Sequence, residues 1–231
     1  MSFVLVHGAG VGASCWEPLL PLLEGDTLAV DLPGRGERRS VDPRSVTLAD
    51  CAAALVEDVE AANLEDIVLV AHSFAGVTAP LAMSALADRL RHVVFLSAVV
   101  PPDGTRVIDQ IDPDVRVAVE ASIEGGVYRQ DPLGAAAMLC NDMDAEQTDW
   151  MIDQLVDDSG ALLTEFVDLS GLRADVPRTY VRLTKDTCYP PELQERSAAV
   201  VGGDTVFLDS GHMAMVTIPD RVAALLDTLA S

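Results

Sequence analysis

The residue with the clearest chemical potential is Ser73, which directly follows a buried strand-like run. In Ile67-Val-Leu-Val-Ala-His-Ser-Phe-Ala-Gly76 the run ends in small residues and then continues as a helical stretch. A serine at such a sharp turn needs small neighbours two positions away on each side, because strand and helix approach closely there. Ala71 and Ala75 meet this need, although glycine is usual at both positions. The pattern predicts a nucleophile; the alternative is an ordinary strand followed by a small-residue helix.

A serine hydroxyl attacks only when an imidazole accepts its proton and a carboxylate holds that imidazole. His212 lies in a late loop within Phe207-Leu-Asp-Ser-Gly-His-Met-Ala-Met215, between a predicted strand and a predicted helix. Asp186 ends Val181-Arg-Leu-Thr-Lys-Asp186 at another strand end. The order Ser73, Asp186, His212 predicts a Ser-His-Asp triad. Asp103, in a turn-like Pro-Pro-Asp-Gly segment, stays open as the competing acid.

The same chemistry needs donors for the negative charge that develops on an attacked carbonyl oxygen. The backbone N–H groups of Ala9, in His7-Gly8-Ala9-Gly10, and of Phe74 are the predicted oxyanion pair. Two interpretations of His7 and His72 stay open: residues that support the loop and turn beside a substrate pocket, or hydrogen-bonded core histidines. The full set of candidate pocket residues is His7, His72, Met213, Met138 and Trp150. No metal ligands are predicted.

A rival interpretation concerns the same N-terminal segment. Gly8-Ala-Gly10-Val-Gly-Ala13, with Asp31 further on, matches the dinucleotide fingerprint G-x-G-x-x-[G/A] of a Rossmann oxidoreductase. Against it, Asp31 continues into a loop broken by proline and glycine. The single lysine, Lys185, also excludes the Tyr-x-x-x-Lys pair of many small reductases. This interpretation leaves Ser73 and His212 unexplained.

These residues are placed by an alternation of apolar runs and helical stretches that predicts an α/β fold with a buried, mainly parallel sheet and helices on both faces. The predicted strands are Phe3–His7, Thr27–Asp31, Ile67–His72, His92–Ala98, Thr179–Thr184 and Thr205–Leu208. The predicted helices are Ser14–Leu23, Leu48–Ala62, Phe74–Leu90, Pro191–Val200 and Pro219–Ala230.

Residues 102–176 separate the fourth strand from the fifth by far more than a normal α/β loop. We expect a helical cap here, inserted into a core of residues 1–101 and 177–231, without strand-like runs. Its predicted helices are Asp114–Ile123, Leu133–Leu139, Glu146–Asp157 and Ala161–Leu169. With 17 acidic and 4 basic residues it has the character of a solvated outer face. Its apolar members should point inward over the strand ends: Met138, Met143, Trp150, Met151 and Phe166.

The amino-acid composition indicates which classes of binding partner are favoured. The 231 residues carry a formal net charge of −22, which disfavours nucleic acid and anionic membrane surfaces and favours a small molecule. No apolar run approaches the ~20 residues of a membrane span, and no basic leader precedes Phe3, so a cytoplasmic location is expected. The four cysteines are scattered, which is typical of reduced thiols. A homodimer is neither favoured nor excluded.

Taken together, Phe3-Val-Leu-Val-His-Gly-Ala9, Asp31-Leu-Pro-Gly34, Ala71-His-Ser-Phe-Ala-Gly76, Thr184-Lys-Asp186 and Gly211-His-Met-Ala-Met215 resemble the α/β-hydrolase superfamily. They are most similar to its compact branch of methylesterases and hydroxynitrile lyases. The resemblance implies six parallel strands in the order 2-1-3-4-5-6. It also implies the esterase side of the branch, because the lyases place a lysine after the catalytic histidine, where this chain has Met213.

The combined expectation is a serine hydrolase that cleaves a small, largely apolar or aromatic carboxylic ester and needs no cofactor. Two alternatives stay open beside the Rossmann interpretation. One is a lyase, cyclase or acyl transferase on the same scaffold, and the other is a small-molecule binder without turnover.

Overall fold

The computed structural model describes residues 1–230, apart from the side chain of Asp114, and Ser231 lies outside the described residues. Within this range six parallel strands form one sheet in the order β2-β1-β3-β4-β8-β9. Their bounds are β1 Ser2–Val6, β2 Asp26–Val30, β3 Ile67–His72, β4 Leu90–Leu96, β8 Arg178–Leu183 and β9 Asp204–Leu208. The α/β-hydrolase fold class and the strand order implied by the resemblance are both confirmed.

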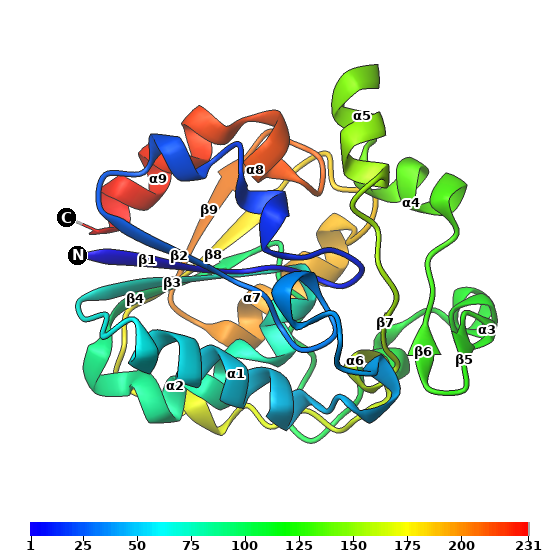
Figure 1. The fold of residues 1–231 in the computed structure, drawn as a ribbon, viewed down its shortest axis with the longest axis horizontal. Coiled ribbons are helices and arrows are strands. Elements are labelled where there is room, and N and C mark those ends of the chain that lie inside the picture. The colour runs from blue at the N-terminus through cyan, green and yellow to red at the C-terminus, as the bar shows by residue number, and fades with distance from the viewer. Residues whose placement is uncertain (231) are drawn as a thin grey trace.

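Helices cover both faces of the sheet, as Figure 1 shows. The helices of the sheet region are α1 Leu48–Ala61, α2 Ala79–Leu86, α7 Pro191–Val201, α8 Ala214–Thr217 and α9 Pro219–Ala230. Side chains of β3 alternate between two apolar clusters, because successive residues of a strand point to opposite faces. Leu69 packs in the cluster that includes Leu55 of α1, and Val70 packs in the cluster that includes Leu226 of α9.

The predicted helix Ser14–Leu23 is wrong in kind. The chain instead forms two short 3-10 helices, η1 Ala13–Trp16 and η2 Leu20–Leu22. Pro18 and Pro21 lack the N–H groups that an α-helix would need at these positions, so only short 3-10 turns form. The remaining 3-10 helices are η3 Gly36–Arg38, η4 Pro43–Ser45, η5 Ser73–Val77, η6 Ala87–Arg89, η7 Val107–Gln110 and η8 Ser170–Arg173.

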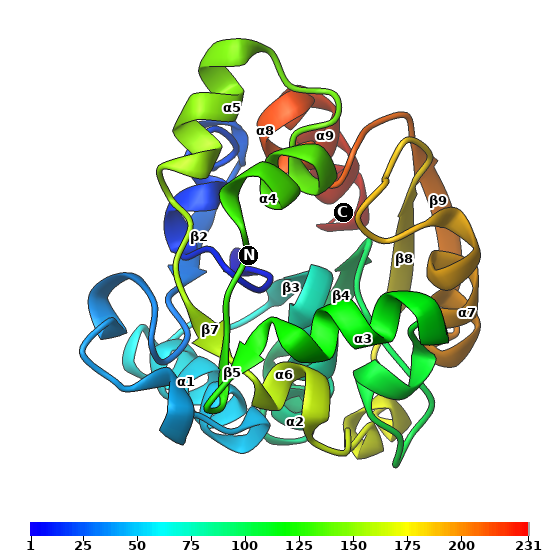
Figure 2. The same cartoon turned by 90° about the vertical axis from the view of Figure 1, so that its right-hand side faces the viewer.

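Between β4 and β8 the chain forms the layer on the right of Figure 1, which faces the viewer in Figure 2. We call residues 102–176 the cap. Its helices are α3 Pro113–Ala121, α4 Pro132–Leu139, α5 Ala145–Ile152 and α6 Ala161–Thr164. The expectation of a cap without strands is wrong, because three short antiparallel strands occur among its described residues: β5 Ile123–Glu124, β6 Val127–Tyr128 and β7 Asp158–Ser159. Gly125 and Gly126 connect β5 to β6 with φ of 57° and 86°, as a tight two-residue hairpin requires.

Apolar cap side chains join both core clusters, with Leu162 in one and Met151 in the other. Met143 and Trp150 pack half-buried against the second cluster, and Met138 is 36% exposed. The expectation that Phe166 points inward is wrong. This side chain is 69% exposed, with the guanidinium of Arg106 5.5 Å from its ring centroid. The predicted helix to Leu169 ends at Thr164, and in the irregular segment that follows it is Val167, 2% exposed, that is buried instead.

Candidate active site

Ser73 occupies a strained turn at the carboxyl end of β3. Its φ is +53°, an unusual value for a residue other than glycine, and η5 begins at this residue. Ala71 and Ala75 are buried on either side, so both small neighbours are used. Gly76 is needed for a further reason, since a Cβ there would collide with the backbone carbonyl of Val99. The turn thus presents the hydroxyl of Ser73 at the sheet edge.

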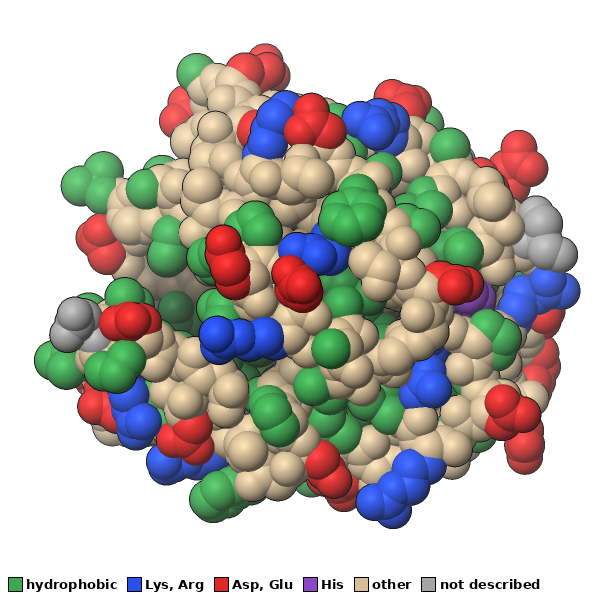
Figure 3. Space-filling model, turned by 180° about the vertical axis from the view of Figure 1, so that it is seen from behind, with side chains coloured by type: hydrophobic (Ala, Val, Ile, Leu, Met, Phe, Trp, Pro, Cys, Tyr) green, Lys and Arg blue, Asp and Glu red, His purple; other side chains and the backbone are tan. Residues whose placement is uncertain are grey.

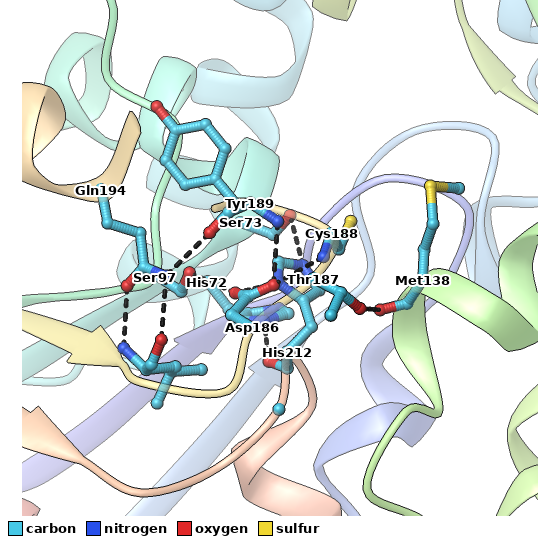
Figure 4. A network of polar contacts seen from close by, with 12 residues as sticks. His72, Ser73, Ser97, Met138, Asp186, Thr187, Cys188, Tyr189, Gln194 and His212 are labelled. Carbon is cyan, nitrogen blue, oxygen red and sulfur yellow. Dashed lines mark hydrogen bonds and ion pairs between the residues drawn. The ribbon is translucent and has the colours of Figure 1, made fainter. Parts of the chain in front are cut away.

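Figure 4 shows that Ser73, His212 and Asp186 meet at this edge. His212 Nε2 lies 3.0 Å from Ser73 Oγ, and His212 Nδ1 lies 2.7 Å from Asp186 Oδ2. Asp186 can only accept while ionised, so Nδ1 carries the proton and Nε2 is free to accept the hydrogen of Ser73. The structure therefore brings together the three residues of the predicted triad.

Several hydrogen-bond donors stabilise the ionised carboxylate of Asp186. Its Oδ2 also accepts from Ser97 Oγ at 2.6 Å, while Oδ1 accepts from the backbone N–H groups of Cys188 at 2.9 Å and Tyr189 at 2.8 Å. Burial alone would raise the pKa of Asp186, but the nearby His212 and these hydrogen bonds outweigh burial and lower it. The contact of Ser97 with Asp186 was not predicted from the sequence. The available signal was the position of Ser97 directly after the apolar run of β4.

The opposite balance acts on His212. Burial alone would lower the pKa of its ring, but the charge of Asp186, together with the hydrogen bond to it, raises that pKa well above 6.5. Cys188 also contributes to raising the pKa. The pair therefore stabilises the imidazolium form, which a general base adopts after it removes a proton. Asp103, the competing acid, instead accepts from the N–H of Leu169 at 2.8 Å, within the cap.

The segment after β1 lies against Ser73. A Cβ on Gly8 would lie 2.7 Å from Ser73 Cβ, so glycine permits the close approach. His7 Nδ1 donates to Gly8 O at 2.8 Å, and His7 Nε2 accepts from Leu32 N at 3.2 Å. Because a trans peptide points its C=O and N–H in opposite directions, the first bond turns the N–H of Ala9 away from His7. Ala9 itself lines the cavity described below.

Phe74, the other predicted donor, is oriented in the same way. Ser73 O accepts from Val99 N at 2.8 Å, so the N–H of Phe74 points away from Val99, which lies just beyond the end of β4. Phe74 is the second residue of η5, where backbone N–H groups have no acceptor inside the helix. Ala9 and Phe74 both line the cavity that contains Ser73.

That cavity has a volume of about 420 Å³ and a mainly apolar lining under the cap. Met138, Met213 and His72 line it, together with Val115 and Val119 of α3. Figure 3 shows that the surface is hollowed on the side of the cap, at its left, with hydrophobic side chains inside the hollow. Cys188 and Tyr189 also face the cavity and were not anticipated, although they follow the predicted Asp186 by only two and three residues.

Two of the candidate pocket residues do not line this cavity. His7 is fully buried, and both its ring nitrogens are used by Gly8 and Leu32. Trp150 lies on α5 and packs half-buried against the second apolar cluster, away from the residues that line the cavity. His72 does reach the lining, and its Nε2 donates to the backbone carbonyl of His212 at 3.0 Å. His72 thereby supports the loop that carries His212.

The residues that match the dinucleotide fingerprint do not form a strand–turn–helix of the Rossmann kind. After Gly8 and Gly10 the chain enters the short η1 rather than a long α-helix, so no helix N-terminus of the usual kind faces a pyrophosphate. Asp31, which would bind a ribose, accepts from the backbone N–H groups of Ala13 at 2.8 Å and Glu37 at 3.0 Å. Its carboxylate holds two loops together.

Among residues 1–230, no group of three or more His, Cys, Asp or Glu side chains could hold a metal ion. No helix in this described range is both long and apolar enough to cross a membrane.

Comparison with known proteins gives a consistent picture. A sequence model of the alpha/beta hydrolase family matches residues 3–225. Norfluorocurarine synthase 1 of Strychnos nux-vomica is 26% identical over 268 residues, covering 99% of this chain and 94% of that protein. Polyneuridine aldehyde esterase of Rauvolfia serpentina is 27% identical over 254 residues, covering 97% and 93%.

Among solved structures, an extracellular alpha/beta-hydrolase from a Paenibacillus species superposes with a TM-score of 0.90. It shares 22% sequence identity, and the match covers 99% of this chain and 98% of that one. This likeness concerns the fold.

Proposed function

The chain belongs to the alpha/beta hydrolase family, and from that premise we propose that it is a serine esterase for small, largely apolar or aromatic carboxylic esters. Ester hydrolysis in the broad sense agrees with the relatives, one of which is named an esterase. The observation that carries the finer proposal is the hydrogen-bonded chain from Ser73 Oγ through His212 to Asp186.

In the proposed first half-reaction, Ser73 Oγ attacks the ester carbonyl carbon while His212 Nε2 takes the hydroxyl proton. The carbonyl oxygen becomes negative and is stabilised by the N–H groups of Ala9 and Phe74. When the tetrahedral species collapses, His212 returns the proton to the departing alkoxide, and an acyl-enzyme on Ser73 remains. Water then attacks the acyl group with His212 as base, which releases the acid and restores Ser73.

The substrate class follows from the cavity. Its volume of about 420 Å³ suits a small molecule, and its lining is largely apolar, with Val115, Val119 and Met213 among the walls. Such a lining favours an apolar or aromatic group on the ester. No cofactor is required by this mechanism.

The test is hydrolysis of short-chain aryl esters, such as phenyl acetate and phenyl butyrate. Ser73→Ala should lose about 10⁴-fold or more in kcat, because the nucleophile is removed. Ser84→Ala is the matched control, since Ser84 is an exposed serine on the next helix, α2, and should retain full activity. If Ser73→Ala keeps most of the wild-type activity, the proposal fails.

One observation favours a second candidate. A relative that covers nearly the whole chain is named a synthase. A lyase, cyclase or acyl transferase could use Ser73 and His212 for acid–base work in the same cavity. An enzyme that is inert toward a panel of esters, yet labelled at Ser73 by an aryl phosphonate, would support this candidate. Failure of Ser73 to react with the phosphonate would instead favour a binding protein.

A further inference from the structure

The peptide groups on both sides of Ala9 are held by side chains. On one side His7 fixes Gly8 O, as described above. On the other side the N–H of Gly10 donates to Asp158 Oδ2 at 2.9 Å, although the two residues are 148 positions apart. The same cap segment also binds the carbonyl of Gly10, which accepts from Val156 N at 2.9 Å. The cap therefore grips the peptide that follows the proposed oxyanion donor.

Asp158 is itself rigidly held. Its side chain and that of Arg35 are each 1% exposed and form an ion pair through Asp158 Oδ1. The same oxygen accepts from Ser159 N at 2.7 Å, and Arg35 Nη1 donates to Pro33 O at 2.9 Å. With Oδ1 occupied in this way, Oδ2 is directed at Gly10. A buried charge pair with these bonds leaves the carboxylate little freedom to rotate.

A second cap aspartate does the same for the histidine loop. Asp142, in the connection between α4 and α5, accepts from Gly211 N at 2.5 Å and from Ser210 Oγ at 3.2 Å. Gly211 directly precedes His212, and a Cβ on Gly211 would collide with the carboxylate of Asp142. The neighbouring Asn141 donates to Lys185 O at 2.8 Å, one residue before Asp186. In Figure 2 this connection lies beside α8, which follows the histidine loop.

We propose that Asp158 and Asp142 are positioning residues for catalysis. Asp158 aims the N–H of Ala9 at the oxygen of the reacting carbonyl, and Asp142 keeps His212 in line with Ser73. The cap is then part of the catalytic framework as well as a wall of the pocket. This inference rests on the proposed esterase function, because it assigns these residues to the oxyanion site and to the base.

Variants of Asp158 must avoid leaving the charge of Arg35 buried and unpaired, which would itself strongly destabilise the protein. Two double variants solve this. Arg35→Met with Asp158→Asn keeps an oxygen that can accept from Gly10 N–H, whereas Arg35→Met with Asp158→Leu keeps none. Both remove the ion pair, so the two variants differ in whether a side-chain acceptor remains for the backbone N–H groups of Gly10 and Ser159. Asp142→Ala tests the second contact.

The control is Asp131→Ala. Asp131 also accepts a backbone N–H, that of Gly134 at 2.9 Å, but this bond caps α4 within the cap and does not join the cap to the Ser73 or His212 segments. Its loss should lower thermal stability without changing catalysis. Thermal unfolding of every variant separates damage to folding from damage to positioning.

The readouts are kcat and KM for an aryl ester and the affinity for an aryl trifluoromethyl ketone. The ketone is attacked by Ser73 Oγ: a C–O bond forms, the carbonyl π bond breaks, the proton passes to His212, and the oxygen becomes an oxyanion. We expect the Leu double variant to lose about 10- to 100-fold in kcat and in ketone affinity relative to the Asn double variant, with KM little changed. Asp142→Ala should lose a comparable factor in both.

Equal kcat and ketone affinity in the two double variants would overturn the role of Asp158. Losses in Asp142→Ala no larger than those in Asp131→Ala would overturn the role of Asp142. A wild-type enzyme that neither hydrolyses esters nor binds the ketone would refute the proposed function instead, so the two failures are distinguishable.

Discussion

Replacing His7 by glutamine should change how the stability of the protein depends on pH. Burial, and then the charge of Arg35, lowers the pKa of His7 from 6.5 to about 4. The ring is fully buried, so the folded protein keeps it neutral where the unfolded chain would protonate it. Between these two pKa values the unfolded state binds more protons than the folded state. The stability that depends on neutral His7 is therefore fully present above pH 6.5 and is lost progressively as the pH falls toward 4.

The size of this effect follows from the shift. At about pH 5 the unfolded His7 is almost fully protonated and the folded one is largely neutral, which costs about 2 kcal/mol relative to about pH 8. Glutamine can donate to Gly8 O and accept from Leu32 N but does not titrate, so His7→Gln should lack this loss. The free energy of unfolding, measured by urea denaturation at both pH values, should fall about 2 kcal/mol less in the variant than in the wild type.

Other changes in the absolute stability of His7→Gln cancel in this comparison, because only the difference between the two pH values is used. Val4→Ala, in the fully buried part of β1, is a suitable control: it creates a cavity without removing a titrating group. Its pH dependence should parallel that of the wild type. Parallel curves for His7→Gln as well would show that this histidine is not held neutral by its surroundings.

Two further predictions concern the triad. Asp186→Asn should reduce kcat about 10³- to 10⁴-fold and move the acid limb of the kcat/KM profile to lower pH, because burial then lowers the pKa of His212 with no carboxylate to raise it; an acid limb that stays in place would contradict the assigned pairing. Ser73→Gly should be about 1 kcal/mol more stable than Ser73→Ala in urea denaturation, because glycine adopts the φ of +53° without strain; equal stabilities would mean that Ser73 is unstrained.

The strands of the main sheet, and the proximity of the three candidate triad residues, were predictable because both follow from local sequence patterns. Strands buried on both faces require unbroken apolar runs, and all six predicted runs overlap strands of the main sheet found in residues 1–230. The carboxyl ends of parallel strands share one edge, so residues such as Asp186, just after a strand, could be expected near Ser73. In the structure His212 lies between these two residues and is hydrogen-bonded to both.

What the sequence did not reveal depends on contacts between distant segments. Strands of two residues, such as β6 and β7, are too short to show a period, and β7 pairs only because the hairpin reaches it. Asp158 is one of many acidic residues in the cap, and nothing near it in the chain separates it from solvated ones. Its burial depends on Arg35, which lies in a loop 123 residues earlier.

Backbone strain in the site is concentrated at two serines on neighbouring strands. Ser73 follows β3 with φ of +53°, and Ser97 follows β4 with φ of +41°. Such conformations cost about 1–3 kcal/mol each and persist only where the surroundings fix them. Here the fixing bonds come from the sheet edge, since Ser73 O accepts from Val99 N at 2.8 Å and Ser97 N donates to Val181 O at 2.9 Å.

The two strained turns lie at opposite ends of one chain of hydrogen bonds, which runs from Ser73 through His212 and Asp186 to Ser97. The turn at Ser73 directs its hydroxyl to His212, and the turn at Ser97 directs its hydroxyl to the carboxylate that holds His212. Relaxing the turn at Ser73 would move the hydroxyl that bonds His212, and relaxing the turn at Ser97 would move the hydroxyl that bonds Asp186. The two turns are neighbours, because β3 and β4 are adjacent in the sheet. Strain at Ser97 is therefore expected to matter for the orientation of Asp186, as strain at Ser73 is expected to matter for the proposed attack.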